Sequence, residues 1–361
     1  MASQAEVDAL RRALALSARA LGTTSPNPPV GAVVLDAAGA VAGAGWTQPA
    51  GGAHAEVVAL AEAAERAAGG TMVVTLEPCR HTGRTAPCTS ALLAAGISRV
   101  VVGCADPTAE AGGGAQLLRE AGLEVETDVL TDEVARGALE AWLTSRALGR
   151  PFVTWKYAAT LDGRSAAADG TSRWITGEQA RSDVHRLRSE VDAVLAGVGT
   201  VLADDPLLDV RPDRGHQPLR VIVDSEGRTP LTARALSGAH PAVVALRAAA
   251  AVQDTGYPRT LELPTGPDGH VDLPALLQRL AEEHGVSSVL LEGGPTLAGA
   301  FVAADLVDRV VGYIAPALLG DGRPALAAAG VGTISAVHRL RLDEVRRIGD
   351  DVRLTLRPRR S

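Results

Sequence analysis

Residues 54–88 read HAEVVALAEAAERAAGGTMVVTLEPCRHTGRTAPC, and the first half of the chain is organised around this stretch. It contains His54-Ala55-Glu56, then Pro78-Cys79, then Pro87-Cys88. A neutral imidazole and two thiolates can hold one Zn²⁺ and leave the fourth tetrahedral position open for water. An open position is typical of a catalytic site, because zinc lowers the pKa of the bound water toward about 7. Glu56 can take the proton of that water.

The order His-x-Glu, Pro-Cys and a second Cys is typical of zinc-dependent nucleobase deaminases, in which the glutamate is not a ligand. Residues two apart in a regular helix diverge by about 200°. His54 and Glu56 can therefore converge on one water only where a helix begins, and Gly51-Gly52 predicts such a start. The short β-branched run 71–76 predicts a strand that delivers Cys79 at its carboxyl end. The alternative is a capping histidine with two ordinary core cysteines.

Eight residues, 80–87, separate the two cysteines, where most deaminases of this kind have two. The insertion carries two arginines, a histidine and two threonines, which suit a phosphate better than a bare base. We expect this loop to hold a phosphorylated substrate, with His81 and Arg84 as contacts; a solvated polar loop is the alternative. His81 could compete as a zinc ligand, but it lies only two residues after Cys79, and we place it outside the ligand set.

The composition limits the possible partners. A length of 361 residues predicts about two domains, and the 2% aromatic content means that their cores are built from Ala, Val and Leu. A net charge of −7 argues against a nucleic-acid partner, since polyanion-binding surfaces are usually basic. No apolar run approaches the length of about 18 residues that suggests a membrane span. Three cysteines give no disulfide framework and favour a reducing cytoplasm.

The elements expected in the first half alternate between helix and strand, which predicts a sheet covered on both faces. Asn27 stands between prolines in the loop before the first strand and could hydrogen-bond a substrate base, although Asn-Pro is also a common turn dipeptide. After an amphipathic opening helix we expect a β-hairpin over 32–46, helix 54–68, strand 71–76, helix 88–95, strand 99–103, helix 113–121, strand 123–126 and an amphipathic segment over 132–148.

A domain boundary is predicted at Gly149-Arg150-Pro151, which divides the chain into domains 1–149 and 150–361. The second domain again alternates strands with helices, and two of its strands run into glycine turns, 197–200 and 292–300. A strand, a glycine turn and a helix N-terminus form a place for phosphates. Two such turns favour a dinucleotide site, although neither follows the Rossmann spacing. Each turn alone could be an ordinary α/β loop.

A series of motifs resembles the bifunctional riboflavin biosynthesis proteins of the RibD family. The resemblance runs from residue 6 to about residue 357 in the family's order. The motifs that carry it are Pro26-Asn27-Pro28 with Val30-Gly31, the zinc-ligand stretch already quoted, Leu161-Asp-Gly-Arg164, Ser172-x-Trp-Ile-Thr176, Thr200-Val-Leu-Ala-Asp204 with Asp205-Pro206, and Glu292-Gly-Gly-Pro-Thr-Leu-Ala298.

The resemblance implies an α/β chain with an N-terminal, three-layer cytidine-deaminase-like domain and a C-terminal dihydrofolate-reductase-like domain. The first would remove the pyrimidine amino group of 2,5-diamino-6-ribosylamino-4(3H)-pyrimidinone 5′-phosphate with Zn²⁺. The second would reduce the ribosyl group to ribityl with NADPH. The partner would be this small phosphorylated pyrimidine, with no nucleic acid and no membrane, and we expect a homo-oligomer.

The resemblance also implies site residues. The zinc ligands would be His54, Cys79 and Cys88, with Glu56 as the proton shuttle, in agreement with the reading from residue chemistry. Apart from the resemblance, we expect Lys156 or Asp204 to lie near the reacting carbon of the reductase. Its substrate contacts would be Ser172, Arg188, Leu208, Arg211 and Glu292. Its cofactor contacts would be Ala158, Trp174, Thr200, Asp204, Ser225, Gly294, Pro295, Thr296, Leu297, Ala298, Gly299 and Ala300.

The match is imperfect at Asp106-Pro-Thr-Ala-Glu110, where the family usually has Asp-Pro-Asn-Pro. If the missing Asn contacts substrate, deaminase affinity falls; if it only shapes a turn, little changes. Three rival interpretations remain. One is a deaminase that acts on tRNA or free nucleosides, against which the acidic balance and the second domain argue. Another is a zinc nucleoside or base deaminase with a non-catalytic nucleotide-binding module at the C-terminus. The third is a structural zinc protein whose fourth ligand is a further Cys or His.

Overall fold

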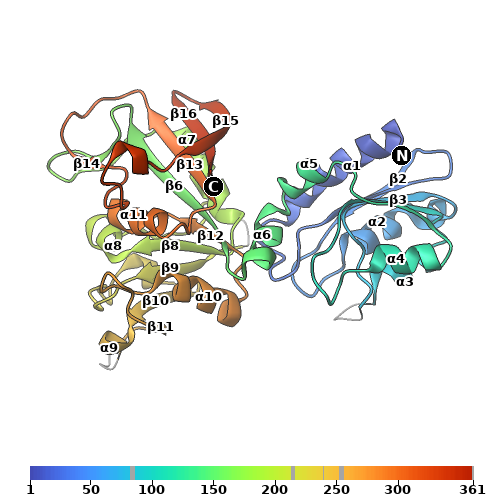
Figure 1. The fold of residues 1–361 in the computed structure, drawn as a ribbon, viewed down its shortest axis with the longest axis horizontal. Helices are drawn as coiled ribbons and strands as arrows, with labels where there is room; N and C mark the ends of the chain where they lie inside the picture. The colour runs from blue at the N-terminus through green and yellow to red at the C-terminus, as the bar shows by residue number, and fades with distance from the viewer. Residues whose placement is uncertain (82–85, 213–215, 239, 252–255, 360–361) are drawn as a thin grey trace. The chain divides into compact units, whose positions relative to one another are not determined.

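The computed structural model describes residues 1–81, 86–212, 216–238, 240–251 and 256–359. It divides into two compact units, Met1–Arg150 and Pro151–Ser361 (Figure 1). No helix in these described ranges is long and apolar enough to cross a membrane.

Unit 1 is built on a five-stranded sheet in the order β2-β1-β3-β4-β5. The first two strands form the predicted hairpin, β1 is antiparallel to β3, and the remaining pairs are parallel. Buried β-branched residues dominate β3 and β4, which explains why these segments become central strands. The strands are β1 (Gly31–Leu35), β2 (Val41–Trp46), β3 (Thr71–Leu76), β4 (Arg99–Cys104) and β5 (Glu124–Glu126).

The helices of unit 1 follow the predicted alternation with two differences in length. The predicted helix 54–68 continues beyond residue 63 only as a 3₁₀ turn. The predicted segment 132–148 is two helices, because the chain turns at Gly137, where an added Cβ would lie 3.1 Å from Leu14 Cδ2. The elements are α1 (Gln4–Ser17), η1 (Ala18–Ala20), α2 (Ala55–Ala63), η2 (Ala64–Ala67), α3 (Cys88–Ala94), α4 (Gly114–Glu120), α5 (Thr131–Ala135) and α6 (Glu140–Leu148).

Helix α2 lies unusually close to strand β2, because the strand presents glycines to it. A Cβ at Gly43 would lie 2.2 Å from the Ala59 carbonyl oxygen, and one at Gly45 would lie 2.5 Å from that of Ala55. Neither contact leaves room for a side chain. This packing fixes the start of α2, where His54 and Glu56 stand, against the sheet.

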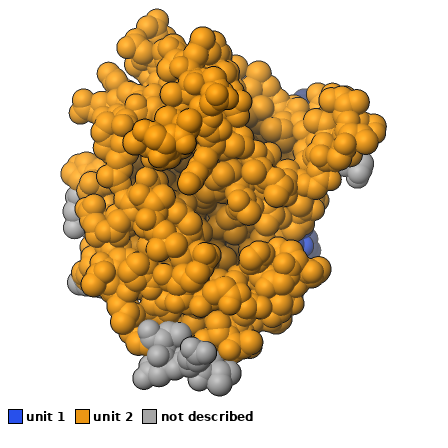
Figure 2. Space-filling model, turned by 90° about the vertical axis from the view of Figure 1, so that its left-hand side faces the viewer, with its two compact units in different colours: residues 1–150 blue, residues 151–361 orange. Residues whose placement is uncertain are grey.

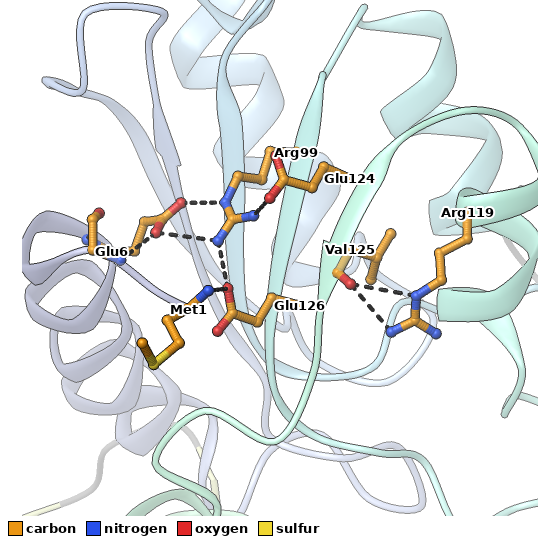
Figure 3. A network of polar contacts seen from close by, with 8 residues as sticks. Met1, Glu6, Arg99, Arg119, Glu124, Val125 and Glu126 are labelled. Atoms are coloured by element: carbon orange, nitrogen blue, oxygen red, sulfur yellow. Dashed lines mark hydrogen bonds and ion pairs between the residues drawn. The ribbon is translucent and has the colours of Figure 1, made fainter.

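An ion-pair network around Arg99 ties the N-terminal helix to the sheet of unit 1 (Figure 3). Arg99, at the start of β4, binds Glu6 of α1 at 2.6 Å, Glu126 of β5 at 2.6 Å, and Glu124. Although burial alone would raise it, hydrogen bonds from Arg99 and Ser3 hold the pKa of Glu6 below its usual value. Because the arginine side chain is only 15% exposed, this network is screened less by water than an ordinary surface pair.

Unit 2 contains a nine-stranded sheet in the order β11-β10-β9-β8-β12-β6-β13-β16-β15. The strands from β11 to β13 are parallel, and the hairpin β15–β16 adds antiparallel to β13. The strands are β6 (Phe152–Thr160), β8 (Ala193–Gly197), β9 (Leu219–Val223), β10 (Ala242–Arg247), β11 (Thr260–Leu263), β12 (Ser288–Leu291), β13 (Arg309–Ala315), β15 (Leu340–Ile348) and β16 (Asp351–Pro358). Two short strands, β7 (Arg164–Ala166) and β14 (Arg323–Pro324), pair separately.

Helices cover both faces of this sheet, as alternation along the chain predicted. Successive residues of β8 divide between two cores: Ala193 and Leu195 pack with α10 and α11, and Val194 and Ala196 pack with α7. The helices are α7 (Glu178–Ser189), α8 (Val198–Asp204), η3 (Arg234–Leu236), α9 (Ala248–Ala251), α10 (Leu273–His284), α11 (Pro295–Ala303) and η4 (Ile334–Ala336). This arrangement leaves the carboxyl ends of the parallel strands free to carry a site.

Candidate zinc site and reductase site

His54 is the residue at which α2 begins. It is the N-cap, with extended backbone angles of φ −72° and ψ 159°, and Glu56 lies in the first helical turn. The change from extended to helical backbone places both residues on the same side, which a continuous helix would not do. Glu56 is buried, with 4% of its surface exposed.

Two cysteines converge on His54 from different elements. Cys79 follows strand β3 and Cys88 begins α3, and the three ligand atoms lie within 4.8 Å of one another. His54 Nδ1 is 3.1 Å from Cys88 Sγ and 3.6 Å from Cys79 Sγ. In the described part of the chain no fourth His, Cys, Asp or Glu joins this group. One imidazole and two thiolates fit a zinc ion with an open coordination position.

The charges at the site suit a cation. The hydrogen bond with Cys88 and the neighbouring His54 lower the pKa of Cys79 to about 4. The hydrogen bond between His54 and Cys79 raises the pKa of His54. A separate hydrogen bond between Cys88 and Cys79, together with burial, raises the pKa of Cys88. Burial also raises the pKa of Glu56, whose carboxyl group contacts the Cys88 thiol. The two sulfurs and the ring nitrogen therefore share protons. A bound divalent cation would take the place of those protons.

Glu77 is a buried residue that the sequence analysis did not select. Its carboxylate accepts three backbone N–H bonds, from Asp106 at 3.1 Å, Gly113 at 3.1 Å and Ala115 at 2.8 Å. These bonds fasten the loop between β4 and α4 to the segment that carries Cys79. The position of Glu77 before Pro-Cys gave no signal, since its partners are backbone groups 29, 36 and 38 residues away along the chain.

The departure from the family pattern at Thr108 shapes a turn. Thr108 donates to Asp106 Oδ1 from its backbone N–H at 2.8 Å and from its hydroxyl at 2.6 Å. The same hydroxyl accepts from the Ala111 N–H at 3.3 Å. Arg80 lies over the end of this loop and donates to the Ala109 carbonyl at 3.4 Å. The threonine hydroxyl is therefore engaged within the loop.

Two of the expected deaminase substrate contacts, Asn27 and His81, lie in loops of the described part of unit 1. Asn27 is half-buried in the loop before β1, and a bond from the Ala50 N–H to the Thr23 carbonyl, 3.3 Å long, joins this loop to the one that leads to His54. His81 is exposed, two residues after Cys79. Arg84 lies outside the described residues.

Three expected reductase residues meet in the interior of unit 2. Arg188 on α7 binds Glu292, which follows β12, through two bonds of 2.5 Å and 2.9 Å. Lys156 on β6 lies 3.9 Å from the same carboxylate. Although burial alone would raise it, Arg188 and Lys156 lower the pKa of Glu292 to about 2. Burial lowers the pKa of Lys156, which makes this lysine readier to release a proton.

The loop after α8 extends this cluster. Arg188 also donates to the Asp209 carbonyl at 2.9 Å, and the Asp209 carboxylate pairs with Arg211 at 3.0 Å. Leu208 is buried beside them with a positive φ of 54°. His185, one turn before Arg188 on α7, has its Nδ1 3.1 Å from both the Asp209 carbonyl and the Arg211 N–H. Its spacing of three residues from Arg188 puts the two side chains on one face of α7, which is visible in the sequence.

A second group of expected residues surrounds the end of α8. The Ser172 hydroxyl donates to Asp204 Oδ1 at 3.0 Å, and Arg173 donates to the Asp204 carbonyl. The Trp174 ring is 69% exposed, and the Arg181 guanidinium lies 4.5 Å from its centre. An exposed indole held by an arginine can stack on a flat ligand.

The glycine turn after β12 leads into a helix N-terminus. Gly294 is the N-cap of α11, and a Cβ there would lie 3.4 Å from Thr200 Oγ1 of α8. A Cβ at Gly293 would lie 3.0 Å from Leu297 Cδ2. A helix N-terminus that follows a glycine turn is a place where backbone N–H groups can bind an anion. Residues Pro295, Thr296, Leu297, Ala298, Gly299 and Ala300 form the first turns of α11.

The other expected cofactor contacts stand on neighbouring strands. Ala158 is half-buried on β6, and Ser225 follows β9, where its hydroxyl accepts from the Val271 N–H at 3.0 Å. The space-filling view shows one face of unit 2, which is hollowed near its middle (Figure 2). A glycine turn, an exposed indole and polar groups at the strand ends together fit a phosphorylated dinucleotide such as NADPH.

Both units match known families. Residues 151–354 match the RibD C-terminal domain, and residues 3–104 match the cytidine and deoxycytidylate deaminase zinc-binding region. The expected α/β fold class, with a cytidine-deaminase-like first domain and a reductase second domain, is therefore confirmed.

Curated relatives cover nearly the whole chain. The chain is 46% identical to the riboflavin biosynthesis protein RibD of Mycobacterium tuberculosis over 353 residues, which cover 97% of this chain and 96% of that protein. It is 40% identical to RibD of Escherichia coli K12, over 96% of this chain and 98% of that protein.

Solved structures agree at the level of the fold. Acinetobacter baumannii RibD superposes with a TM-score of 0.88 at 39% identity, over 99% of each chain. A Thermotoga maritima diaminohydroxyphosphoribosylaminopyrimidine deaminase/5-amino-6-(5-phosphoribosylamino)uracil reductase superposes with a TM-score of 0.87 at 33% identity, over 98% of this chain and 99% of that one. The chain belongs to the RibD family of bifunctional riboflavin biosynthesis enzymes, which combine a zinc-dependent deaminase with an NADPH-dependent reductase.

Proposed function

We propose that this bifunctional enzyme carries out two consecutive reactions on one phosphorylated pyrimidine. The first, in residues 1–149, replaces the ring amino group of 2,5-diamino-6-ribosylamino-4(3H)-pyrimidinone 5′-phosphate by oxygen and releases ammonia. The second, in residues 150–361, reduces the ribosyl group to give 5-amino-6-(5-phosphoribitylamino)uracil. The convergence of His54, Cys79 and Cys88 beside the buried Glu56 carries the proposal. The two activities in the name of the Thermotoga maritima relative support it.

In the deaminase, His54, Cys79 and Cys88 hold the metal ion and Glu56 moves the proton. Bound zinc supplies a Lewis acid that activates a water molecule for attack on the ring carbon. Glu56 accepts a proton from that water and gives it to the departing amino group, which leaves as ammonia. Burial favours the protonated form of this carboxyl group, so that it can hold the proton between the two transfers.

The loops around this site recognise the remainder of the substrate. Asn27 can donate to and accept from a ring edge, and His81 with Arg84 suits the 5′-phosphate. Thr108 acts on the shape of its loop, since its hydroxyl is already bonded to Asp106 and Ala111. We therefore expect the departure from the family pattern at residues 106–110 to leave the deaminase competent.

In the reductase, Lys156, Glu292 and Arg188 form the reacting end of the site. NADPH supplies the hydride when it is bound. Lys156 gives or holds a proton near the reacting sugar carbon, and Glu292 keeps the lysine in place beside Arg188. Ser172, Leu208 and Arg211 contact the substrate. The cofactor is held by Ala158, Trp174, Thr200, Asp204, Ser225 and the turn from Gly294 to Ala300.

We also infer a homo-oligomer in the cytoplasm. Strand β15 is the edge of the nine-stranded sheet, and Leu342 and Val345 on it are 52% and 59% exposed. An open edge with apolar side chains is a surface that a second copy can cover. Three free cysteines and the use of NADPH suit a reducing compartment.

One assay tests the two reactions together. Purified zinc-loaded chain is mixed with the pyrimidine substrate and NADPH, and ammonia and NADPH absorbance are followed in the same sample. The proposal expects ammonia to appear first and NADPH consumption to depend on it. Ammonia without NADPH consumption would favour the rival reading of a non-catalytic C-terminal module. No ammonia from zinc-loaded protein would refute the deaminase assignment.

A further inference from the structure

The order of strands in unit 2 gives the cofactor site two ends. Lys156 and Glu292, at the reacting end, belong to β6 and to the segment after β12. The glycine turns stand at the carboxyl ends of β12 and β8. The next strands in the same direction are β9 and β10, both parallel to β8. A dinucleotide whose nicotinamide lies at the reacting end would direct its adenosine toward the carboxyl ends of β9 and β10.

A charged pair stands at those two strand ends. Arg247 is the last residue of β10, and Glu226 follows β9 one residue after Ser225. Arg247 forms an ion pair with Glu226 and donates from Nε to the Ser225 carbonyl at 3.3 Å. The arginine side chain is 23% exposed and the glutamate side chain 51% exposed. The guanidinium is thus fixed on one side and accessible on the other.

This pair lines a polar cavity of about 160 Å³. The remaining lining residues are Ala249 and Ala250, just after β10. Small side chains leave space next to the guanidinium, and that space is sufficient for a phosphate group. Dinucleotide enzymes distinguish NADP from NAD by an arginine that binds the 2′-phosphate or by an acid that binds the free 2′-hydroxyl. Here an arginine and a glutamate, Arg247 and Glu226, line the same cavity. Their ion pair decides which of the two side chains is available to a ligand.

We propose that Arg247 binds the adenosine 2′-phosphate and makes the reductase select NADPH over NADH. Glu226 is the positioning residue: it holds the guanidinium beside Ser225 in the absence of cofactor and gives up the ion pair to the phosphate when cofactor binds. Neither residue belongs to the contacts assigned by family resemblance. The inference rests on the proposed reductase site, because Ser225 and the glycine turn set where the adenosine falls.

Titration calorimetry with 2′,5′-ADP and 5′-AMP tests this inference on the full zinc-loaded chain. These two probes differ only in the 2′-phosphate and require no turnover. Arg247→Ala should weaken 2′,5′-ADP binding by about ten- to a hundredfold and leave 5′-AMP binding within about twofold, since one charge-assisted bond is lost. Glu226→Gln should leave 2′,5′-ADP binding equal or tighter. Arg259→Ala is the matched control, because Arg259 is exposed just before β11, at the amino edge of the parallel strands, whereas Arg247 ends β10 at their carboxyl edge.

The kinetic counterpart is the ratio of kcat/KM for NADPH to that for NADH. It should fall about ten- to a hundredfold in Arg247→Ala, through KM for NADPH. Equal loss of both probes in Arg247→Ala would show a structural role and overturn the inference. Wild-type chain that binds 2′,5′-ADP no tighter than 5′-AMP would overturn it as well, while the reductase assignment would stand. If the wild-type chain binds neither probe and does not bind NADPH, the proposed reductase site itself is contradicted.

Discussion

Replacement of Glu56 by Gln tests the proton shuttle of the deaminase. Glutamine preserves the size and hydrogen-bonding capacity of the side chain but cannot carry a proton. The substitution leaves His54, Cys79 and Cys88 unchanged, so zinc should remain bound. The two units have separate cores, so the reductase rate with deaminated substrate should remain that of wild type.

The burial of Glu56 sets the size of the effect. Positioned acid–base catalysis contributes about 10²–10⁴-fold. Glu56 is only 4% exposed, so bulk water has little access to replace it. The other ionisable groups that contact it are zinc ligands, which cannot exchange protons while they hold the metal. We therefore expect deaminase kcat to fall by about 10³–10⁴-fold, near the upper end of the range for acid–base catalysis. This loss corresponds to an increase of about 4–5.5 kcal/mol in the activation free energy.

The assay compares ammonia release, zinc content and NADPH oxidation in Glu56→Gln, in wild type and in Glu65→Gln. Glu65 is exposed in the 3₁₀ turn that follows the same helix, so its substitution controls for the loss of one charge. A Glu56→Gln protein with full zinc and a deaminase rate within tenfold of wild type would refute the shuttle. Loss of zinc in this variant would show instead that Glu56 contributes to the metal site.

Four further substitutions probe the two sites. Cys88→Ala removes one of three ligands, so metal analysis should find zinc lost and ammonia release abolished while NADPH oxidation with deaminated substrate persists; retained zinc would contradict the ligand set. Lys156→Met should lower reductase kcat by about a hundredfold or more without affecting ammonia release, and an unchanged rate would remove the lysine from the reaction. Glu292→Gln leaves buried cations without their carboxylate, so the free energy of unfolding measured in urea at neutral pH should fall by about 3–5 kcal/mol. Because the folded-state pKa of Glu292 is about 2, below its ordinary 4.5, this difference is fully present above about pH 4.5 and should shrink as the pH falls toward 2; a constant difference would contradict it. Gly299→Ala places a Cβ 1.7 Å from the Ala327 carbonyl oxygen and should lower both Tm and NADPH affinity, and a wild-type Tm would show that α11 can shift freely.

The zinc site could be predicted from sequence because its information is local. Ligand chemistry, the glycines before His54 and the β-branched strand before Cys79 each indicate the same arrangement. The structure brings the three ligand atoms together at the start of α2, as that argument required. The alternation of strands and helices likewise predicted two sheets covered by helices.

Features that depend on distant backbone groups could not be predicted. Glu77 accepts hydrogen bonds from three N–H groups that lie 29, 36 and 38 residues away, and the sequence shows only a glutamate before Pro-Cys. The predicted segment 132–148 is split by a turn at Gly137, where the chain packs against Leu14 of α1. His185 contacts a loop more than twenty residues further along the chain. In each case the deciding partner is brought near only by the tertiary fold.

X-ray absorption at the zinc edge, on metal-replete enzyme, measures whether the metal ion keeps a coordination position open for solvent. We expect one zinc per chain with two sulfur neighbours at about 2.3 Å and two nitrogen or oxygen neighbours at about 2.0–2.1 Å. One of the lighter neighbours should be exchangeable solvent, displaced by a substrate analogue without loss of metal. A third sulfur, a second histidine nitrogen in place of solvent, or no zinc bound at all would contradict the account.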